Sequence, residues 1–206
     1  MSDDVVSVLF ALFGSDGNNV EYRCDALRQE PRYIIVEEHK YEEREKQVIE
    51  MIKYLPKPLI VYVIEPATAK RYCRKLNKLG FNNIFAYTGE TSDKERENLL
   101  EKWKNNEFDV MIATSAFGMG VDKSNVRTIV HSCVPENLSR FYQEVGRAGR
   151  DGLPSLSVLS VYSSQYDNRN DLTVAFGLVN KSILKKRNLI ISRKVSKNSL
   201  IMRWNF

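Results

Sequence analysis

Short apolar runs alternate with longer amphipathic stretches along most of the chain. The runs Leu59–Ile64 and Val110–Ala113 are apolar throughout, which is typical of strands that are covered on both faces. Between such runs, apolar residues recur at helical spacing among charged ones, as in Tyr41–Tyr54. Strands that alternate with helices in this way pair in parallel through helical crossovers. The pattern therefore predicts an α/β fold in which a doubly wound parallel sheet carries helices on both faces.

Glycines, capping residues and changes of period set the expected boundaries of these elements. Thr91-Ser92-Asp93, followed by Glu95, has the chemistry of a helix N-terminus. We expect helices at Tyr41–Tyr54, Pro66–Leu79, Ser92–Trp103 and Ser139–Val145. We expect strands at Arg32–Glu38, Pro58–Ile64, Asn83–Tyr87, Val110–Thr114, Arg127–His131 and Leu156–Tyr162.

The two ends of the chain do not follow this alternation. Val5–Phe13 is apolar and predicts a short helix before a breaker-rich loop, whereas Lys181–Lys197 is strongly basic. We expect residues 33–165 to form one domain, preceded by residues 1–32 and followed by a C-terminal extension, 166–206, that is helical or partly disordered. For that extension a packed helix ranks first, and the start of a further domain or a disordered basic tail are the alternatives.

Composition narrows the class of protein only slightly. The 206 residues carry a net charge of +5, which suits a polyanionic partner but also describes many cytosolic proteins. Cys24, Cys73 and Cys133 are odd in number and widely spaced, so they build neither a disulfide framework nor a CxxC zinc site. The apolar N-terminal run is too short to span a bilayer and no basic leader precedes it. We therefore expect an intracellular protein without a metal site or a membrane partner.

The loop after the strand Val110–Thr114 is the first candidate for chemistry. Ligands of open parallel sheets bind beyond the carboxyl ends of strands, so the loops after Thr114 and His131 are the places to look. The first loop, Ser115–Lys123, combines small side chains with two glycines, which leave backbone N–H groups accessible to a phosphate. Taken alone, this loop is equally consistent with a glycine-bearing turn that binds no ligand.

A pair of arginines is the second candidate. Arg147 and Arg150 stand three residues apart among glycines, a spacing that places both guanidinium groups on one side of a helix end. Such planar cations stabilise the charge that develops in phosphoryl transfer. The alternative is a surface pair that forms salt bridges to Glu144 and Asp151.

The two segments together are much more specific than either one. ATSAFGMGVDKSNVRTIVH (113–131) and YQEVGRAGRDG (142–152) resemble motifs V and VI of superfamily-two helicases, most closely those of the RecQ-like DNA helicases. The resemblance extends more loosely from Tyr54 to Tyr162. It implies a RecA-like fold of the P-loop NTPase type, here the second (C-terminal) RecA-like domain of an ATP-dependent DNA helicase. Gln143-Glu144 replaces the His-Arg of DEAD-box RNA helicases, which favours the RecQ-like interpretation.

The resemblance also assigns roles to individual residues. Arg150 would be the arginine finger on the γ-phosphate, Arg147 would lie at the phosphates or the domain interface, and Gln143 would assist them. The expected nucleotide-binding residues are Gly118, Gly120 and Asp122. The expected nucleic-acid contacts are Thr114, Ser115, Thr88 and Gly89.

Two acidic positions depart from the family pattern. The strand end at Glu65 lacks the usual hydroxyl and basic residues, and Tyr87-Thr88-Gly89-Glu90-Thr91 replaces the family's Tyr-His-Ala-Gly-Leu. Glu90 thereby places an acid where DNA would pass. The same residues also fit a simple turn before a helix cap.

The chain lacks the parts that bind ATP in this family. It contains no G-x-x-x-x-G-K-[ST] loop and no acidic Asp-Glu pair after a buried strand to hold Mg²⁺. ATP and Mg²⁺ are therefore expected mainly in a first RecA-like domain, and residues 1–32 are interpreted as its last helix and the linker. We expect the isolated chain to be inactive and Met1 to be an artificial start, with a naturally truncated gene as the alternative.

The expected partners are this first domain and DNA, single-stranded or at an unwinding duplex, in a cytoplasmic, nucleoid-associated or nuclear location. The competing function is a DNA- or protein-binding module that kept the helicase fold without the motor, and a flavodoxin-like enzyme for a small phosphate ligand is a third. Among single residues, His131 is expected to be structural and Trp103 to belong to the core. Lys185–Arg187 is either a DNA contact or a solvated basic face.

Overall fold

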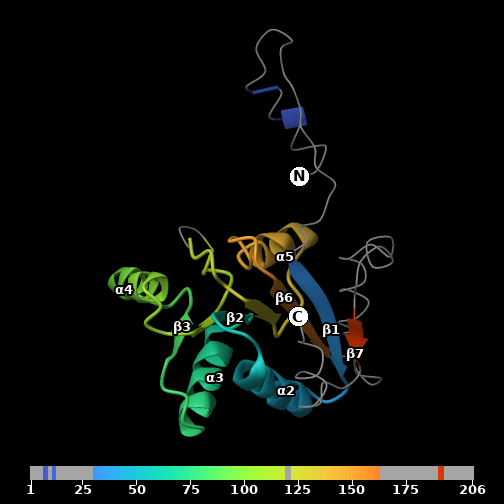
Figure 1. Cartoon of the computed structure of the whole chain (residues 1–206), viewed down its shortest axis with the longest axis vertical. Helices are drawn as coiled ribbons and strands as arrows, with labels where there is room; N and C mark the ends of the chain where they lie inside the picture. The colour runs from blue at the N-terminus through green and yellow to red at the C-terminus, as the bar shows by residue number, and fades with distance from the viewer. Residues whose placement is uncertain (1–6, 9–10, 13–29, 119–121, 163–189, 193–206) are drawn as a thin grey trace.

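A computed structural model describes residues 7–8, 11–12, 30–118, 122–162 and 190–192 of the chain (Figure 1). Within these residues seven strands form one sheet in which every pairing is parallel, in the order β3-β4-β2-β5-β6-β1-β7. The strands are β1 (Pro31–Glu38), β2 (Leu59–Tyr62), β3 (Ile84–Tyr87), β4 (Val110–Ala113), β5 (Thr128–His131), β6 (Ser155–Tyr162) and β7 (Ile190–Ser192). The helices are α2 (Tyr41–Tyr54), α3 (Pro66–Lys78), α4 (Asp93–Lys104) and α5 (Leu138–Val145).

The doubly wound parallel sheet predicted from the apolar pattern is confirmed. The six expected strands and four expected helices are all present, and no boundary shifts by more than two residues. Ser92, for example, is the N-cap of α4 rather than its first residue, because its hydroxyl accepts a hydrogen bond from the backbone N–H of Glu95 at 3.4 Å. Likewise, β2 ends before Ile64, whose side chain is 72% exposed.

The helices cover both faces of the sheet, as Figure 1 shows with α2 and α3 on one side and α5 on the other. Alternate residues of each strand supply the two cores, because successive side chains of a strand point to opposite faces. Val61 packs with α2 and α3, whereas its neighbours Ile60 and Tyr62 pack with α4. On that second face, Phe141 of α5 lies against the ring of His131, with 5.1 Å between the ring centroids. The helix α5 is thereby fixed over the carboxyl end of β5.

The two ends of the chain are described only in part. Of the N-terminal stretch expected to be helical, residues 7–8 and 11–12 are helical, and the rest lies outside the described residues. In the C-terminal extension, Ile190–Ser192 pairs in parallel with β1 as an edge strand, where we expected a helix. Two consecutive isoleucines favour strand over helix once a free strand edge is near. Lys185–Arg187 lies outside the described residues, and no described helix has the length and apolar character to cross a bilayer.

Candidate functional site

The loop after β4 runs across the face covered by α4 and α5 and is anchored at two points. Phe117 is buried, with its ring centroid 5.0 Å from that of Tyr87 and 6.5 Å from that of Trp103. Further on, Lys123 is also buried, and its Nζ donates to the backbone oxygen of Trp103 at 2.7 Å. Burial lowers the pKa of Lys123, and the carbonyl groups at the C-terminal end of α4 compensate the ammonium charge. The core therefore fixes the loop at Phe117 and at Lys123.

The arginine segment follows the end of α5 as a tight turn. Gly149 has a φ of +63°, and its N–H donates to the oxygen of Val126 at 2.9 Å. A Cβ at this position would lie 2.8 Å from the oxygen of Leu153 and 2.9 Å from Oγ of Ser155. Only glycine fits both the backbone conformation and the space. The glycines around the two arginines thus let the chain turn sharply between α5 and β6.

Both arginines lie along the loop that follows β4. The guanidinium group of Arg147 donates to the backbone oxygen of Gly118. Arg150 forms an ion pair with Asp122, with 3.1 Å between Nη1 and Oδ1, and its Nε donates to the oxygen of Gly146 at 3.1 Å. The structure therefore brings four of the expected site residues together in two pairs. Arg147 contacts Gly118 and Arg150 contacts Asp122, the last and first described residues on either side of 119–121.

The alternative interpretation, a surface arginine pair bridged to Glu144 and Asp151, gains no support for these two partners. Asp151 forms its ion pair with Arg127. Glu144 is paired with His131 and with Arg140. Arg150 has Asp122 as its ion-pair partner instead, and Arg147 donates to the backbone of Gly118.

The arginine side chains meet the loop after β4 that the sequence analysis named, but the backbone of their segment lies at the amino ends of β5 and β6. Gly149 contacts Val126, just before β5, and Arg127 donates to the oxygen of Pro154, just before β6, at 3.2 Å. These contacts place the segment beside the amino ends of both strands. The reason is that a crossover helix runs back along the sheet, so a segment after α5 ends far from the carboxyl edge.

The expected nucleic-acid contacts do lie at the carboxyl edge. Thr88 and Gly89 follow β3, and Thr114 and Ser115 follow β4, the neighbouring strand. The N–H of Thr114 donates to the oxygen of Tyr87 at 3.1 Å, so the two loops adjoin. Gly89 and Ser115 are exposed, whereas Thr88 and Thr114 are 2% and 5% exposed. The two threonines shape the loops, and the exposed pair offers a surface to a ligand.

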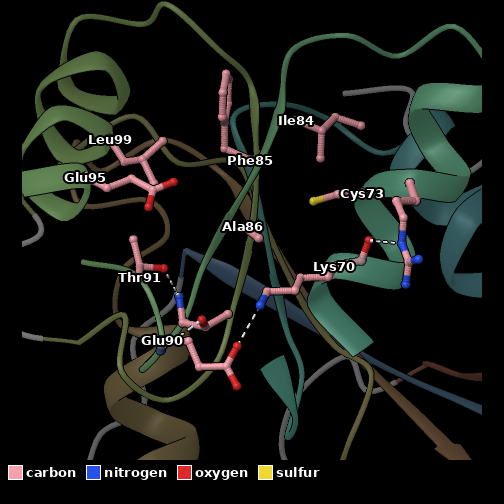
Figure 2. A pocket seen from close by; sticks show the side chains of 11 residues that line it. Lys70, Cys73, Ile84, Phe85, Ala86, Glu90, Thr91, Glu95 and Leu99 are labelled. Carbon is pink, nitrogen blue, oxygen red and sulfur yellow. Dashed lines mark hydrogen bonds and ion pairs between the residues drawn. The ribbon is translucent and has the colours of Figure 1, made fainter. Parts of the chain in front are cut away.

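Thr88 to Thr91 form the turn that the sequence allowed as an alternative to a DNA contact. The Thr88 hydroxyl accepts from the N–H of Glu90 at 3.2 Å, and the Thr88 N–H donates to Oγ1 of Thr91 at 3.0 Å. Glu90 points away from the turn toward Lys70 of α3, with 2.6 Å between its carboxylate and Nζ (Figure 2). The acid at this edge is therefore paired with a lysine that would otherwise be available to a phosphate.

Lys70 and Glu90 stand at an open pocket of about 630 Å³ between α3, β3 and α4. Figure 2 shows Cys73 and Ile84 on one side and Glu95 and Leu99 on the other. Burial raises the pKa of the Cys73 thiol to about 11, so it is a thiol at neutral pH. The pocket lining is mixed in charge and adjoins Gly89.

The remaining residues that the sequence analysis singled out differ in burial. Gln143 is exposed on α5, and Gly120 lies outside the described residues. His131 is fully buried and bonded to Glu144, which confirms its structural role, and Trp103, at 1% exposure, belongs to the core as expected.

Sequence reasoning missed several residues that hold the site together. Arg140 and Glu144 are separated by four residues on a helix, and this spacing could have revealed their ion pair. The bond from Lys123 to Trp103 joins distant segments, and no local pattern indicates it.

The side chain of Arg150 is 36% exposed, so a phosphate can approach it from solvent, whereas Arg147 is partly buried. The Nε of Arg147 is buried without a hydrogen-bond partner among the described residues, and Arg150 is bonded to an Asp122 side chain that is 90% exposed. An exposed ion pair contributes little to stability. A phosphate can therefore replace Asp122 as the partner of Arg150 at a small cost in free energy. No three His, Cys, Asp or Glu side chains gather as a metal site within the described ranges.

Comparison with known proteins shows the family of the chain. Residues 35–152 match the family model described as helicase conserved C-terminal domain. The chain is 46% identical over 99 residues to the ATP-dependent DNA helicase RecQ of Bacillus subtilis, covering 47% of this chain and 17% of that protein. It is 34% identical over 135 residues to RecQ of Pasteurella multocida, covering 66% and 21% respectively. The chain thus spans only about a fifth of the length of these relatives.

Solved structures share the fold at low sequence identity. The C-terminal domain of the DEAD-box protein Dbp5 superposes with a TM-score of 0.71 at 15% identity, covering 84% of this chain and 96% of that domain. Saccharomyces cerevisiae Dbp5 bound to RNA and ADP BeF3 gives a TM-score of 0.78 at 15% identity, over 94% of this chain and 49% of that one. These matches establish a RecA-like architecture for the chain.

Proposed function

The chain belongs to the helicase conserved C-terminal domain family, and from this premise we propose that it is the second motor domain of a RecQ-like ATP-dependent DNA helicase. The observation that carries the proposal is that Arg147 bonds to Gly118 and Arg150 to Asp122, two residues of the loop that follows β4. The sequence similarity to RecQ helicases supports DNA rather than RNA as the substrate.

In this proposal the chain supplies the arginine half of an ATPase site. Negative charge spreads over the transferred phosphoryl group in the transition state, and fixed guanidinium groups stabilise it. ATP with Mg²⁺ supplies that phosphoryl group and is held mainly by a P-loop domain. Arg150 exchanges Asp122 for the γ-phosphate, Arg147 braces the loop at Gly118, and Gln143, exposed on α5, assists them.

The carboxyl edge of the sheet is the proposed track for DNA. Ser115 and the backbone of Gly89 are exposed on adjoining loops, where they can bond successive phosphates of a single strand. Thr114 and Thr88 hold these loops in shape from inside. ATP that closes the two RecA-like domains, and hydrolysis that reopens them, would then step this edge along DNA.

ATP turnover by the chain alone tests the half-site proposal. We expect the isolated chain to hydrolyse no ATP above background, with or without single-stranded DNA, because it has no P-loop to hold the phosphates. Fusion to the first RecA-like domain of a RecQ helicase should restore DNA-stimulated turnover. Turnover by the chain alone would show that a complete site lies within it. DNA binding that persists while every P-loop fusion stays inactive would favour the alternative, a binding module without the motor.

The pair of Lys70 and Glu90 leads to a second expectation, for DNA affinity. Glu90→Gln should free Lys70 for a phosphate beside Gly89, because the lysine loses its recorded carboxylate partner at 2.6 Å. We expect the affinity for single-stranded DNA to rise several-fold at low salt, and the slope of log K against log salt to steepen by about 0.7, the value of one added phosphate contact on a single strand. Fluorescence anisotropy with a labelled oligonucleotide, measured across a salt series, would detect both changes.

Glu97→Gln is the matched control, since Glu97 is an exposed acid on α4 that does not line the pocket. It removes the same charge and should raise affinity only slightly. Equal gains in the two variants would assign the effect to net charge alone. A Lys70→Met change in the Glu90→Gln background should cancel the gain.

A further inference from the structure

Glu144 carries a buried carboxylate that the proposed phosphoryl chemistry does not use. Its side chain is 9% exposed, and its two oxygens have different partners. Oε2 lies 2.9 Å from Nε2 of His131, and Oε1 accepts from Nε of Arg140 at 3.2 Å. A buried carboxylate persists only when it is paired and hydrogen-bonded. Both sides of this group are occupied, so its position is closely defined.

His131 ties Glu144 to the sheet. The imidazole is fully buried at the end of β5, and it stacks on Tyr62 with 5.3 Å between centroids. Its Nδ1 has no hydrogen-bond partner among the described residues, so the proton of the neutral ring belongs on Nε2, where it is donated to Glu144. The inner end of the network therefore does not move independently of β5.

Arg140 carries the network outward to the loop after β4. Besides its bond to Glu144, it donates from Nη2 to the backbone oxygen of Ser115 at 2.6 Å. Ser115 is exposed and is one of the two residues proposed to meet DNA. A single guanidinium group thus joins the buried acid to the backbone of the DNA-facing loop.

The chain just after α5 reaches this loop a second time. Arg147 follows Glu144 by three residues, its N–H donates to the oxygen of Glu144 at 3.2 Å, and its guanidinium group donates to Gly118. Arg140 and Glu144 fall on one side of α5 because they are four residues apart, and Arg147 lies in the turn just beyond the C-cap Gly146. The segment from Ser115 to Gly118 is therefore bonded at both ends to residues that Glu144 helps to place.

We propose that Glu144, anchored by His131, is a positioning residue that couples DNA contact at Ser115 to the placement of Arg147. DNA that shifts the Ser115 backbone moves Arg140, and the buried carboxylate transmits this shift to the end of α5. The inference rests on the proposed function, since it assumes DNA at one end of the network and a phosphate at the other. A purely structural ion pair would stabilise the domain without linking the two sites.

ATP hydrolysis by the complete motor, with and without single-stranded DNA, separates these roles. Glu144→Gln keeps the shape of the side chain but removes the charge that binds Arg140 and His131 together. We expect the ratio of the DNA-stimulated rate to the basal rate to fall about tenfold, a usual size for coupling between two sites. The basal rate should fall much less than the DNA-stimulated rate, because the loop carries no DNA in the basal state.

Val145→Ala is the control for stability. Val145 is the next residue of α5, it is 2% exposed, and its truncation removes packing without removing any bond of the network. It should lower the melting temperature and leave the stimulation ratio unchanged. If Glu144→Gln reduces both rates in proportion, or leaves the ratio intact, the coupling role is overturned.

Two further variants keep the test decisive. Should Glu144→Gln fail to fold, Arg140→Gln removes the same link from a side chain that is 32% exposed, and it must show the same loss of ratio. Arg150→Ala tests the underlying function. Intact turnover in that variant would refute the proposed function itself, whereas lost turnover together with an intact ratio in Glu144→Gln would refute the coupling alone.

Discussion

Replacement of Arg150 by Ala is expected to lower the DNA-stimulated ATPase rate of the complete motor by at least about 10³-fold, the range reported for loss of an arginine finger. The reason is electrostatic: the guanidinium group, 36% exposed and bonded only loosely to Asp122, is the cation best placed to meet the charge of the transition state. ATP affinity should change little, because the P-loop domain supplies most of the binding contacts. Turnover under saturating ATP, and binding of a non-hydrolysable analogue, measure the two effects separately.

Two variants sharpen this test. Arg150→Lys keeps the charge but loses the two-pronged geometry, so it should recover only part of the rate. Arg74→Ala removes an exposed arginine from α3, on the opposite face of the sheet, and should leave turnover near the wild-type rate. A rate for Arg150→Ala equal to that of Arg74→Ala would contradict the finger role.

Truncation of Trp103 to Ala should have the largest effect on stability. The side chain is 1% exposed, and its ring lies 5.2 Å from that of Phe108 and 6.5 Å from that of Phe117. The Nζ of Lys123 lies 4.9 Å from its centroid, so the substitution also loosens the anchor of the loop after β4. We expect a loss of about 3–5 kcal/mol in the free energy of unfolding, measured by urea titration.

Trp103→Phe is the matched variant, because it keeps an aromatic ring in the same space and should lose less stability than Ala. We would also measure the DNA affinity of both variants, at a temperature where both are folded, to test whether Trp103 stacks on a base instead. A mild loss of stability together with a large loss of affinity would assign Trp103 to base stacking and contradict its place in the core.

The apolar pattern was enough to predict the sheet because each strand here is covered on both faces. Runs such as Val110–Ala113 are then continuously apolar, a local signal that needs no knowledge of the neighbours. The C-terminal extension behaved differently. Ile190–Ser192 forms a strand only because β1 offers a free edge, and that edge depends on chain about 150 residues away.

The sequence alone determined the type of domain and the identity of the residues with candidate chemistry, since strand and helix periods, glycine turns and the arginine spacing are all local properties. Tertiary structure decided where these residues lie. The crossover of α5 carries the turn at Gly149 to the amino end of β5, while the guanidinium groups of Arg147 and Arg150 contact Gly118 and Asp122 in the loop after β4. Tertiary structure also decided which residues pair. Arg150 meets Asp122, Arg147 meets Gly118 and His131 meets Glu144 only because separate segments pack on one face of the sheet. Burial and pairing arise from contacts between segments distant in sequence, so no local pattern encodes them.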